Sequence, residues 1–419
     1  MLNTLKLRHT MLTCVAQLFS HLLPMNLKYL VKAAFCIFSL TAAGVDSFAQ
    51  LVQPDTQTNG SAYNNIITGV PFLLIIPDAR AAGMGDAGVA VQPDGNAMVI
   101  NPSKLAFLDK TYGISLSYSP WLKNLVPDVT LTYLSGYYKP NAQTAIGGSL
   151  RYFNLGEILL TDINRQDLGV YSPSELAADV TYARRFGESF SLGTTLRYIY
   201  SNTSSSPGSG GPQTHAGSAL AVDVSAYFKR PTYFLGADAI VSAGINLSNI
   251  GTKIGYNDAR SQFFLPANLK IGAASTFLID DYNQFTFALD FNKLMVPTQP
   301  RYDVDGRIIA GKSPDRSVPA SIFGSFSDAP GGFKEELQEL SIAAGMEYWY
   351  SQQFAFRTGY FYENPSKGNR RYLTVGAGLK YNVFNIDFAY LVANSQKSAL
   401  ANTLRFTLLF NFGEAAKDR

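Results

Sequence analysis

Residues that could carry out catalysis are sparse in this chain of 419 residues. His215 is the one histidine beyond residue 49, so a nucleophile–base pair in the rest of the chain would have to use it. It follows a stretch rich in serine and glycine, residues 203–211, which cannot hold a catalytic triad to the required precision. We therefore expect a solvated loop histidine and no enzymatic activity.

Three further patterns imitate ligand-binding motifs. Asp280-Asp281 and the Asp-x-Asp-Gly stretch at 303–306 offer carboxylates to a cation, but a metal site needs more clustered ligands, so both favour turns. The glycines of the stretch 83–88 have the spacing of a dinucleotide fingerprint without the βαβ context that it requires. The sequence predicts no metal and no cofactor.

The composition favours β structure in contact with lipid. The chain is 47% hydrophobic and 16% charged, and it holds 28 Phe, 24 Tyr and 2 Trp, which is too aromatic for a disordered protein. No apolar run in the body of the chain reaches the roughly 18 residues that a transmembrane helix needs. A bundle of membrane-spanning helices is therefore excluded.

The first 49 residues have the pattern of an export signal. After Met25, a basic start leads into the apolar stretch 33–43 and a small-residue cleavage site at 47–49. We interpret Met25 as the true start and residues 1–24 as a start-site artefact. An N-terminal membrane anchor is the alternative interpretation of this region.

Cleavage after residue 49 changes the chemistry of the chain. It removes both cysteines, Cys14 and Cys36, so neither disulfides nor thiolate metal sites are expected. It also removes four of the 34 basic and one of the 31 acidic residues, which leaves 30 of each. A chain with a net charge of zero has no overall positive potential to attract nucleic acid, so the sequence does not predict nucleic-acid binding.

After Lys110 apolar residues alternate with small or polar ones, which is typical of strands between two environments. Fourteen such segments follow one another. We expect strands over 112–118, from 129 up to the connection at 140, and over 146–152, 176–182, 190–198, 220–228, 234–246, 269–277, 285–291, 340–350, 354–362, 372–381, 386–392 and 404–412.

Short and long connections alternate strictly between these segments. Residues 140–143 and 229–233 are short connections, whereas 154–173, 247–266 and 292–339 are long ones. Outer-membrane barrels have tight periplasmic turns and longer outer loops. A soluble β-sandwich, the alternative, does not sort its loops in this way. We predict an all-β fold: a fourteen-stranded antiparallel transmembrane β-barrel in the cell outer membrane, with both termini periplasmic.

The face opposite to lipid carries small residues and charges of balanced sign. The charged residues are Arg151, Arg197, Arg357, Arg405, Asp179, Asp223, Asp290 and Asp387. Residues 50–110 precede the first strand and do not alternate, so we predict that they fill the interior as a plug; a periplasmic arm is the alternative. We expect charge pairs to pin that plug to the wall, with Asp78 and Arg80 as candidates. A transport pathway is the other interpretation of the interior charges.

The stretches 71–73, 77–81, 83–90 and 101–107 form a specific N-terminal pattern, which extends to 117–122 and 134–138. In these residues the chain resembles the PorV family of the type IX secretion system of Bacteroidetes. We take the plug motif to be Asp78, Arg80, Gly83, Gly85, Asp86, Gly88, Asn101 and Pro102. More distantly, the chain resembles the FadL family of fourteen-stranded transporters, whose plug holds an Asn-Pro-Ala turn; Ser103 stands here in place of that alanine.

The resemblance implies a carrier. PorV-like proteins collect cargo that bears a C-terminal β-sandwich signal from the translocon barrel and deliver it to an attachment complex with the PorU sortase. The expected partners are these proteins and outer-membrane lipid. A FadL-like importer of long-chain hydrophobic compounds is the alternative function.

Large side chains in the long connections are candidate contacts, because folded cargo is wider than a filled lumen. We select Phe263, Phe264, Leu265 and Phe333; burial against the barrel rim is the alternative for each. Apolar residues at helical spacing in 333–340 predict a short amphipathic helix leading into the tenth strand. The expected organisation is a signal region (1–49), a plug segment (50–110), a barrel (111–412) and a short tail (413–419).

Overall fold

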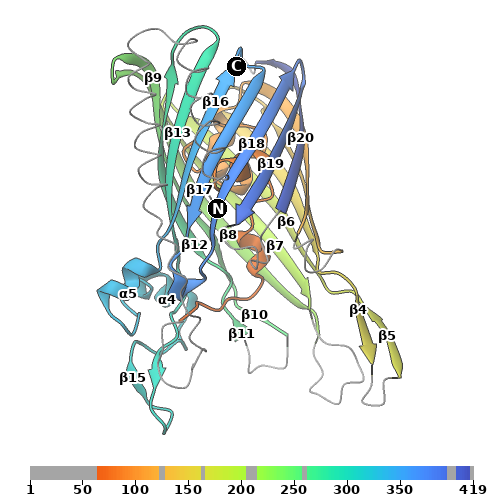
Figure 1. Ribbon diagram of the computed structural model, residues 1–419, viewed down its shortest axis with the longest axis vertical. Coiled ribbons are helices and arrows are strands. Elements are labelled where there is room, and N and C mark those ends of the chain that lie inside the picture. The colour runs from red at the N-terminus through yellow and green to blue at the C-terminus, as the bar shows by residue number, and fades with distance from the viewer. Residues whose placement is uncertain are drawn as a thin grey trace, which may run out of the picture. The chain divides into compact units, whose positions relative to one another are not determined.

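Fourteen antiparallel strands form a closed barrel in the computed structural model, which describes residues 64–121, 128–161, 166–203, 215–256, 262–393 and 403–415 (Figure 1). In chain order the barrel strands are β1 (Lys110–Pro120), β2 (Thr130–Tyr138), β3 (Thr144–Asn154), β6 (Ser174–Phe186), β7 (Phe190–Asn202), β8 (Gly217–Phe234), β9 (Ala237–Gly251), β12 (Asn268–Leu278), β13 (Asn283–Leu294), β16 (Ser341–Tyr350), β17 (Phe354–Tyr362), β18 (Arg371–Tyr381), β19 (Phe384–Ala393) and β20 (Thr403–Ala415). The predicted signal region lies outside the described residues.

The two faces of the wall have opposite chemistry. Along β7, exposed and buried side chains alternate without a break. Outward side chains are large and apolar, as in the row Leu408, Leu116, Leu134 and Leu150, which are paired neighbours on β20, β1, β2 and β3. Most inward side chains are small or polar and are buried, and a few large ones, such as Tyr133, Phe153 and Ile199, are buried among them. This distribution is typical of a barrel in lipid and excludes the sandwich alternative. No helix in the described ranges is long and apolar enough to cross a membrane.

All fourteen predicted strands are present, but the predicted connection at 229–233 is wrong. Strand β8 continues to Phe234, and Leu235 and Gly236 make the turn with φ of 53° and 82°, as a two-residue hairpin turn requires. Beyond Phe228, β8 pairs with β9 alone. Pro231 therefore lies in a two-stranded ribbon with a free edge, where its missing N–H is tolerated.

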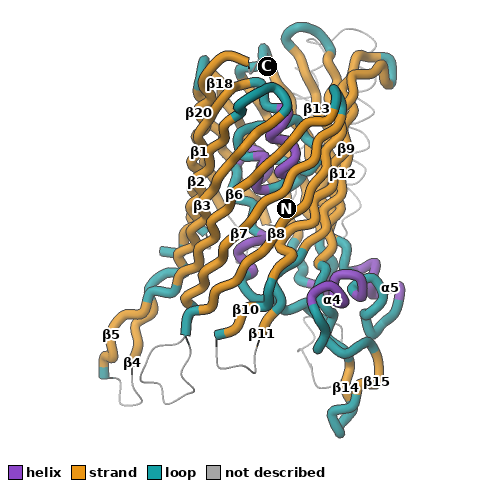
Figure 2. Tube along the Cα trace, turned by 180° about the vertical axis from the view of Figure 1, so that it is seen from behind, coloured by secondary structure: helices purple, strands orange, loops and turns teal. Residues whose placement is uncertain are grey.

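Short and long connections lie at opposite ends of the barrel, which we call the turn end and the loop end (Figure 2). Three small hairpins lie at the loop end: β4 (Ile158–Thr161) with β5 (Asp167–Tyr171), β10 (Ile254–Gly255) with β11 (Gln262–Phe263), and β14 (Arg301–Tyr302) with β15 (Ile308–Ala310). The connection from β13 to β16 also holds α4 (Val318–Gly324) and α5 (Phe333–Gln338), and η5 (Pro365–Lys367) follows β17. Helix α5 confirms the predicted helix before the tenth strand.

The two acidic pairs act in turns, as predicted. Asp280 accepts hydrogen bonds from the backbone N–H groups of Tyr282 and Asn283 at 2.8 and 2.7 Å. Asp303 accepts in the same way from Asp305 and Arg307 at 3.0 and 2.7 Å. Both carboxylates therefore stabilise local backbone.

Residues 64–109, which we call the inner segment, cross the barrel lengthwise (Figure 1, orange). They include η2 (Pro71–Leu74), α3 (Ala79–Gly83), η3 (Ala97–Val99) and η4 (Pro102–Phe107). Asn64 lies at the loop end, where its N–H donates to Ser366 at 3.0 Å. The carbonyl of Ala106 lies at the turn end, where it accepts from Lys139 at 2.9 Å. Asn64 and the end of β20 lie at opposite ends of the barrel. The periplasmic location of both termini stays a prediction.

Candidate functional site: the inner segment and the loop end

Asp78 caps the N-terminus of α3. Its carboxylate accepts from the N–H groups of Arg80 and Ala81 at 3.3 and 2.9 Å, as an N-cap does. Asn96 donates to the same carboxylate at 3.2 Å, and the N–H of Ala79 donates to Thr407 on β20 at 2.9 Å. The helix is thereby tied both to its own segment and to the wall.

Arg80 joins the inner segment to the wall through a ladder of buried charges. Its Nε and Nη2 donate to the two carboxylate oxygens of Glu347 on β16, at 2.8 and 2.7 Å. Its Nη1 donates to Asp94 of the segment at 2.9 Å. Glu347 also accepts from Arg357, which in turn donates to Asp387, each at 2.6 Å. The expected ion pair between Arg80 and the wall is present, but its partner, Glu347, is missing from the predicted interior charges.

A second group of contacts surrounds Asp86. Arg405 on β20 donates to Asp86 at 3.1 Å, and the hydroxyl of Tyr372 on β18 donates to it at 2.6 Å. On the opposite strand β13, Asp290 accepts from the N–H groups of Gly88 and Val89 at 2.7 and 2.9 Å. The wall thus supplies the carboxylate of Asp290 to backbone amides of the glycine-rich stretch. It also supplies the guanidinium of Arg405 to the carboxylate of Asp86, which belongs to that stretch.

Two glycines of the predicted motif let backbones approach closely. Gly85 has φ of +68°, and a Cβ built there would lie 2.5 Å from the N of Tyr360 on β17. A Cβ on Gly83 would lie 3.3 Å from the Cα of Gly376 on β18. At position 85 only glycine combines this close approach with that backbone conformation, and at position 83 an added Cβ would be tightly packed against the wall.

Asn101 and Pro102 start η4 near the turn end. The side chain of Asn101 accepts from the N–H of Ser103 at 3.2 Å and donates to the carbonyl oxygens of Val89 and Ala226 at 2.9 and 3.1 Å. Pro102 occupies the first helical position, where no N–H is needed. The turn therefore couples the segment to β8.

The remaining interior charges also have hydrogen-bond partners, though not all of these partners belong to the inner segment. Arg197 pairs with Asp179 at 2.7 Å and with Asp223 at 3.0 Å, strand to strand across the wall. Arg151 donates instead to the carbonyl oxygen of Leu73 at 2.9 Å. All eight predicted interior charges are buried, which confirms their inward orientation.

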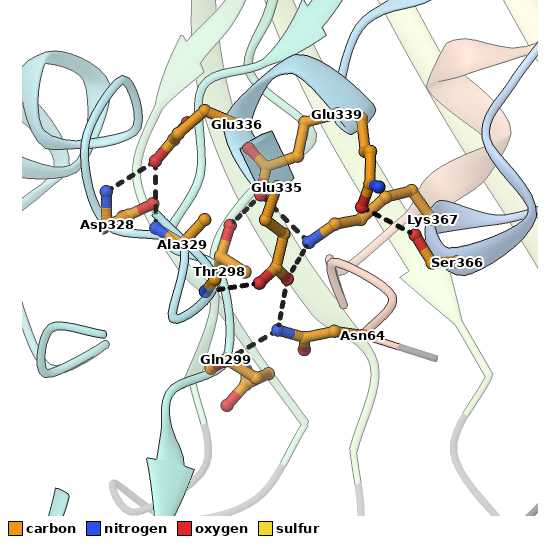
Figure 3. Close-up of polar contacts among 12 residues, drawn as sticks. Asn64, Thr298, Gln299, Asp328, Ala329, Glu335, Glu336, Glu339, Ser366 and Lys367 are labelled. Atoms are coloured by element: carbon orange, nitrogen blue, oxygen red, sulfur yellow. Dashed lines mark hydrogen bonds and ion pairs between the residues drawn. The ribbon is translucent and has the colours of Figure 1, made fainter. Parts of the chain in front are cut away.

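A cluster of acidic residues on α5 holds the loop end together (Figure 3). Lys367 pairs with Glu335 at 2.6 Å and with Glu339 at 3.1 Å. Glu339 accepts from Thr298 at 2.6 Å, and Glu335 accepts from the side chain of Asn64 at 3.0 Å. This network ties the start of the inner segment to α5 and to the connection after β17. Sequence reasoning missed it, because the partners come from four separate stretches of chain.

The candidate cargo contacts lie at the loop end but differ in exposure. Phe263 is exposed, and Phe264 is partly covered, with the ammonium of Lys253 4.3 Å from its ring centroid. Leu265 is only 3% exposed and packs in a cluster with Val70 and Phe72. The choice of Leu265 as a surface contact is therefore wrong, because the β10–β11 hairpin folds back over the inner segment and buries it. Phe333 is exposed.

Two hairpins carry exposed apolar side chains that the sequence reasoning overlooked. Leu159 and Val170 in β4 and β5 are 61% and 60% exposed, and Ile309 in β15 is 65% exposed. Each belongs to an apolar run inside an otherwise polar connection, such as Ile158-Leu159-Leu160. That contrast was the signal available in the sequence. His215, also in a long connection, is exposed, as expected for a solvated histidine.

Similar proteins are found among solved structures but not among curated proteins. No curated protein matches the chain. Among solved structures, it is similar to the toluene transporter TodX of P. putida, with 11% identity, a TM-score of 0.49 and coverage of 80% of this chain and 98% of that chain. It is also similar to a Pseudomonas aeruginosa FadL homologue, with 12% identity, a TM-score of 0.43 and coverage of 84% and 100%.

One protein family matches directly. The family described as type IX secretion system protein PorV matches residues 57–301, which is more than half of the chain. The matched range includes the inner segment and the first nine barrel strands, β1 to β13 in the labels used here. The chain therefore belongs to the PorV family and is an outer-membrane barrel protein of the type IX secretion system.

Proposed function

We propose that this protein is a carrier that holds the C-terminal signal domain of secreted cargo at its loop end. It would receive cargo from the translocon barrel and pass it to a PorU-type sortase in the attachment complex. The observation that carries the proposal is a contrast between the two regions of the candidate site. The interior is tied down by buried polar contacts, whereas the loop end presents apolar hairpins to the outside.

The inner segment acts as a plug in this proposal. Its described residues make hydrogen bonds with nine barrel strands, among them Thr407 on β20, Glu347 on β16 and Asn246 on β9. Breaking one buried charge pair costs about 3–5 kcal/mol, and passage of a large solute would break several. This anchoring supports recognition from outside and argues against the FadL-like importer alternative.

The loop-end hairpins suit a β-rich partner. The β4–β5 and β14–β15 hairpins are two-stranded sheets, so each has edges with unpaired backbone groups. A partner strand can add to such an edge while side chains such as Leu159 and Val170 supply apolar contact. A specific contact typically buries about 800 Å² on each partner, which several hairpins together provide more readily than one loop.

Cargo display at the cell surface tests the proposal. We would make two double variants. One combines Leu159→Ser and Val170→Ser, and the other combines Phe263→Ser and Phe264→Ser. Tyr233→Ser is the matched control, because Tyr233 is 72% exposed at the opposite, turn end. The expected result is that the hairpin variants reach the outer membrane as folded barrels while cargo accumulates unprocessed, and that the control displays cargo normally.

Two outcomes would contradict the carrier function. Normal display in a strain that lacks the protein entirely would eliminate it. Intact display together with lost uptake of a long-chain fatty acid would favour the importer instead.

A further inference from the structure

Helix α4 packs on the outside of the barrel wall. Its Ile322 forms a buried apolar cluster with Ala267 and Met295, and Val318 of α4, Leu247 of β9 and Leu269 of β12 pack against that cluster. Leu247 and Leu269 each lie two residues from an exposed, lipid-facing isoleucine of the same strand, Ile245 and Ile271, and so share its face. The helix therefore covers the lipid-facing side of the wall at the loop end.

Helix α5 packs on the same side, around a lysine. Lys293 lies two residues after Phe291 and four after Leu289, both of which are exposed on the lipid-facing side of β13. It is only 5% exposed, because Glu336 of α5 and Glu339, the C-cap of α5, approach its Nζ to 3.0 and 2.6 Å. A lone cation on this face would be costly beside lipid, and α5 supplies the two carboxylates that cover it.

The large side chains that α4, α5 and the residues between them leave exposed are apolar, apart from Lys334. Phe323 and Phe333 are 79% and 77% exposed, and Phe326 and Leu337 are each 51% exposed. The charged side of α5 is the buried one, as Figure 3 shows for Glu335, Glu336 and Glu339. A helix in water has the opposite arrangement. We call Phe323, Phe326, Phe333 and Leu337 the outer apolar patch.

The position of this patch identifies what covers it. Two residues of a strand span about 7 Å, so Lys293 and the helices around it stand just beyond the apolar band that ends at Phe291. Interfacial helices bury their apolar side about 5–10 Å into the boundary between headgroups and acyl chains. The patch is thus continuous with a surface that already faces lipid, at the depth where an interfacial helix lies.

We propose that α4 and α5 form an interfacial anchor whose outer apolar patch inserts into the outer leaflet of the membrane. The Glu–Lys network of α5 holds the anchor to the barrel, and through Glu335 and Asn64 it holds the start of the inner segment as well. This assignment moves Phe333 from the cargo surface to the membrane surface. It does not rest on the carrier function.

Spin labelling in vesicles tests the anchor. The chain has no cysteine after Cys36, so single cysteines label one site each in the exported protein. We would place a nitroxide at Phe323→Cys and, separately, at Leu337→Cys in protein reconstituted into vesicles of phospholipid and lipopolysaccharide. Leu289→Cys, on the lipid-facing wall, and Val304→Cys, a fully exposed position in the β14–β15 hairpin, are the matched controls. Folding is checked for each variant by its compact migration on unheated gels.

The expected result is that both anchor positions collide with molecular oxygen in preference to a water-soluble nickel chelate, as Leu289→Cys does. Preferential collision with the nickel chelate at both positions, as at Val304→Cys, would overturn the proposal. A third outcome would also overturn the proposal: both positions are exposed to the chelate in vesicles but are protected in membranes that contain the native partners. That result would identify the patch as a protein-docking surface.

Discussion

Arg80 of the inner segment and Glu347 of β16 lie 267 residues apart in the sequence and form a two-bond ion pair in the barrel interior. The side chain of Glu347 is 1% exposed, and Arg357 contacts the same carboxylate. Such a pair forms only when β16 is in place around the segment. The contact therefore makes the position of the inner segment depend on barrel closure.

Arg80→Ala should loosen the inner segment. The substitution leaves Asp94 without its cation and Glu347 with Arg357 alone, and breaking a buried pair typically costs about 3–5 kcal/mol. We expect faster proteolysis of the region before β1 and higher permeability to small antibiotics. Arg230→Ala, at an exposed site in the β8–β9 ribbon, is the control and should change neither. Unchanged proteolysis and permeability in Arg80→Ala would count against a pinned segment.

Gly85→Ala should strain the same region by a different route. An added Cβ would lie 2.5 Å from backbone of β17, and φ of +68° disfavours alanine. Overpacking of this kind costs about 1–3 kcal/mol, measurable as a lower free energy of unfolding in denaturant titrations. Gly136→Ala is the matched control, because its nearest neighbour would be 3.5 Å away. Equal stability of the two variants would contradict the close approach.

Leu408→Arg should impair assembly. Leu408 faces lipid in the row that includes Leu116 and Leu134, and an arginine near the bilayer midplane costs about 2–4 kcal/mol. Tyr381→Arg, at the exposed end of β18, should cost about 0–1 kcal/mol, because the interface tolerates charge. Membrane levels measured by immunoblot should fall for Leu408→Arg alone. Equal levels of both variants and the wild type would argue against this register.

Acid should release α5. Burial acts to raise the pKa of Glu335, but the hydrogen bond and charge of Lys367 outweigh it and hold that pKa below its ordinary value of 4.5. A lowered pKa means that the ionised carboxylate stabilises the fold above pH 4.5, and that this stabilisation is lost as the pH falls below that value. A nitroxide at Leu337→Cys should therefore become more mobile on acidification. Glu335→Gln in the same background should remove most of this response, and an identical response with glutamine would exclude Glu335 as its origin.

Local periodicity was enough to predict the barrel strands. Alternation of apolar and small residues depends on neighbours along the chain, and every strand of the wall meets the same two environments. The one error in a connection was at 229–233, where β8 continues with β9 as its single partner. Glu347 was within reach of the same alternation, because it is in phase with the buried Ala343 of β16.

By itself, the sequence determined the strand number, the alternation of short and long connections, the inward charges and the glycine-rich and Asn-Pro motifs, since each of these is a pattern of residue type and spacing. Only the tertiary structure decided that Arg80 pairs with Glu347, that Leu265 is buried by the inner segment, and that α5 turns its glutamates inward and Phe333 outward. Helical spacing shows that a helix has two sides but not which side meets a neighbour. That choice depends on Lys293 and Lys367, which approach α5 only after the barrel has brought β13 and the connection after β17 to the same end.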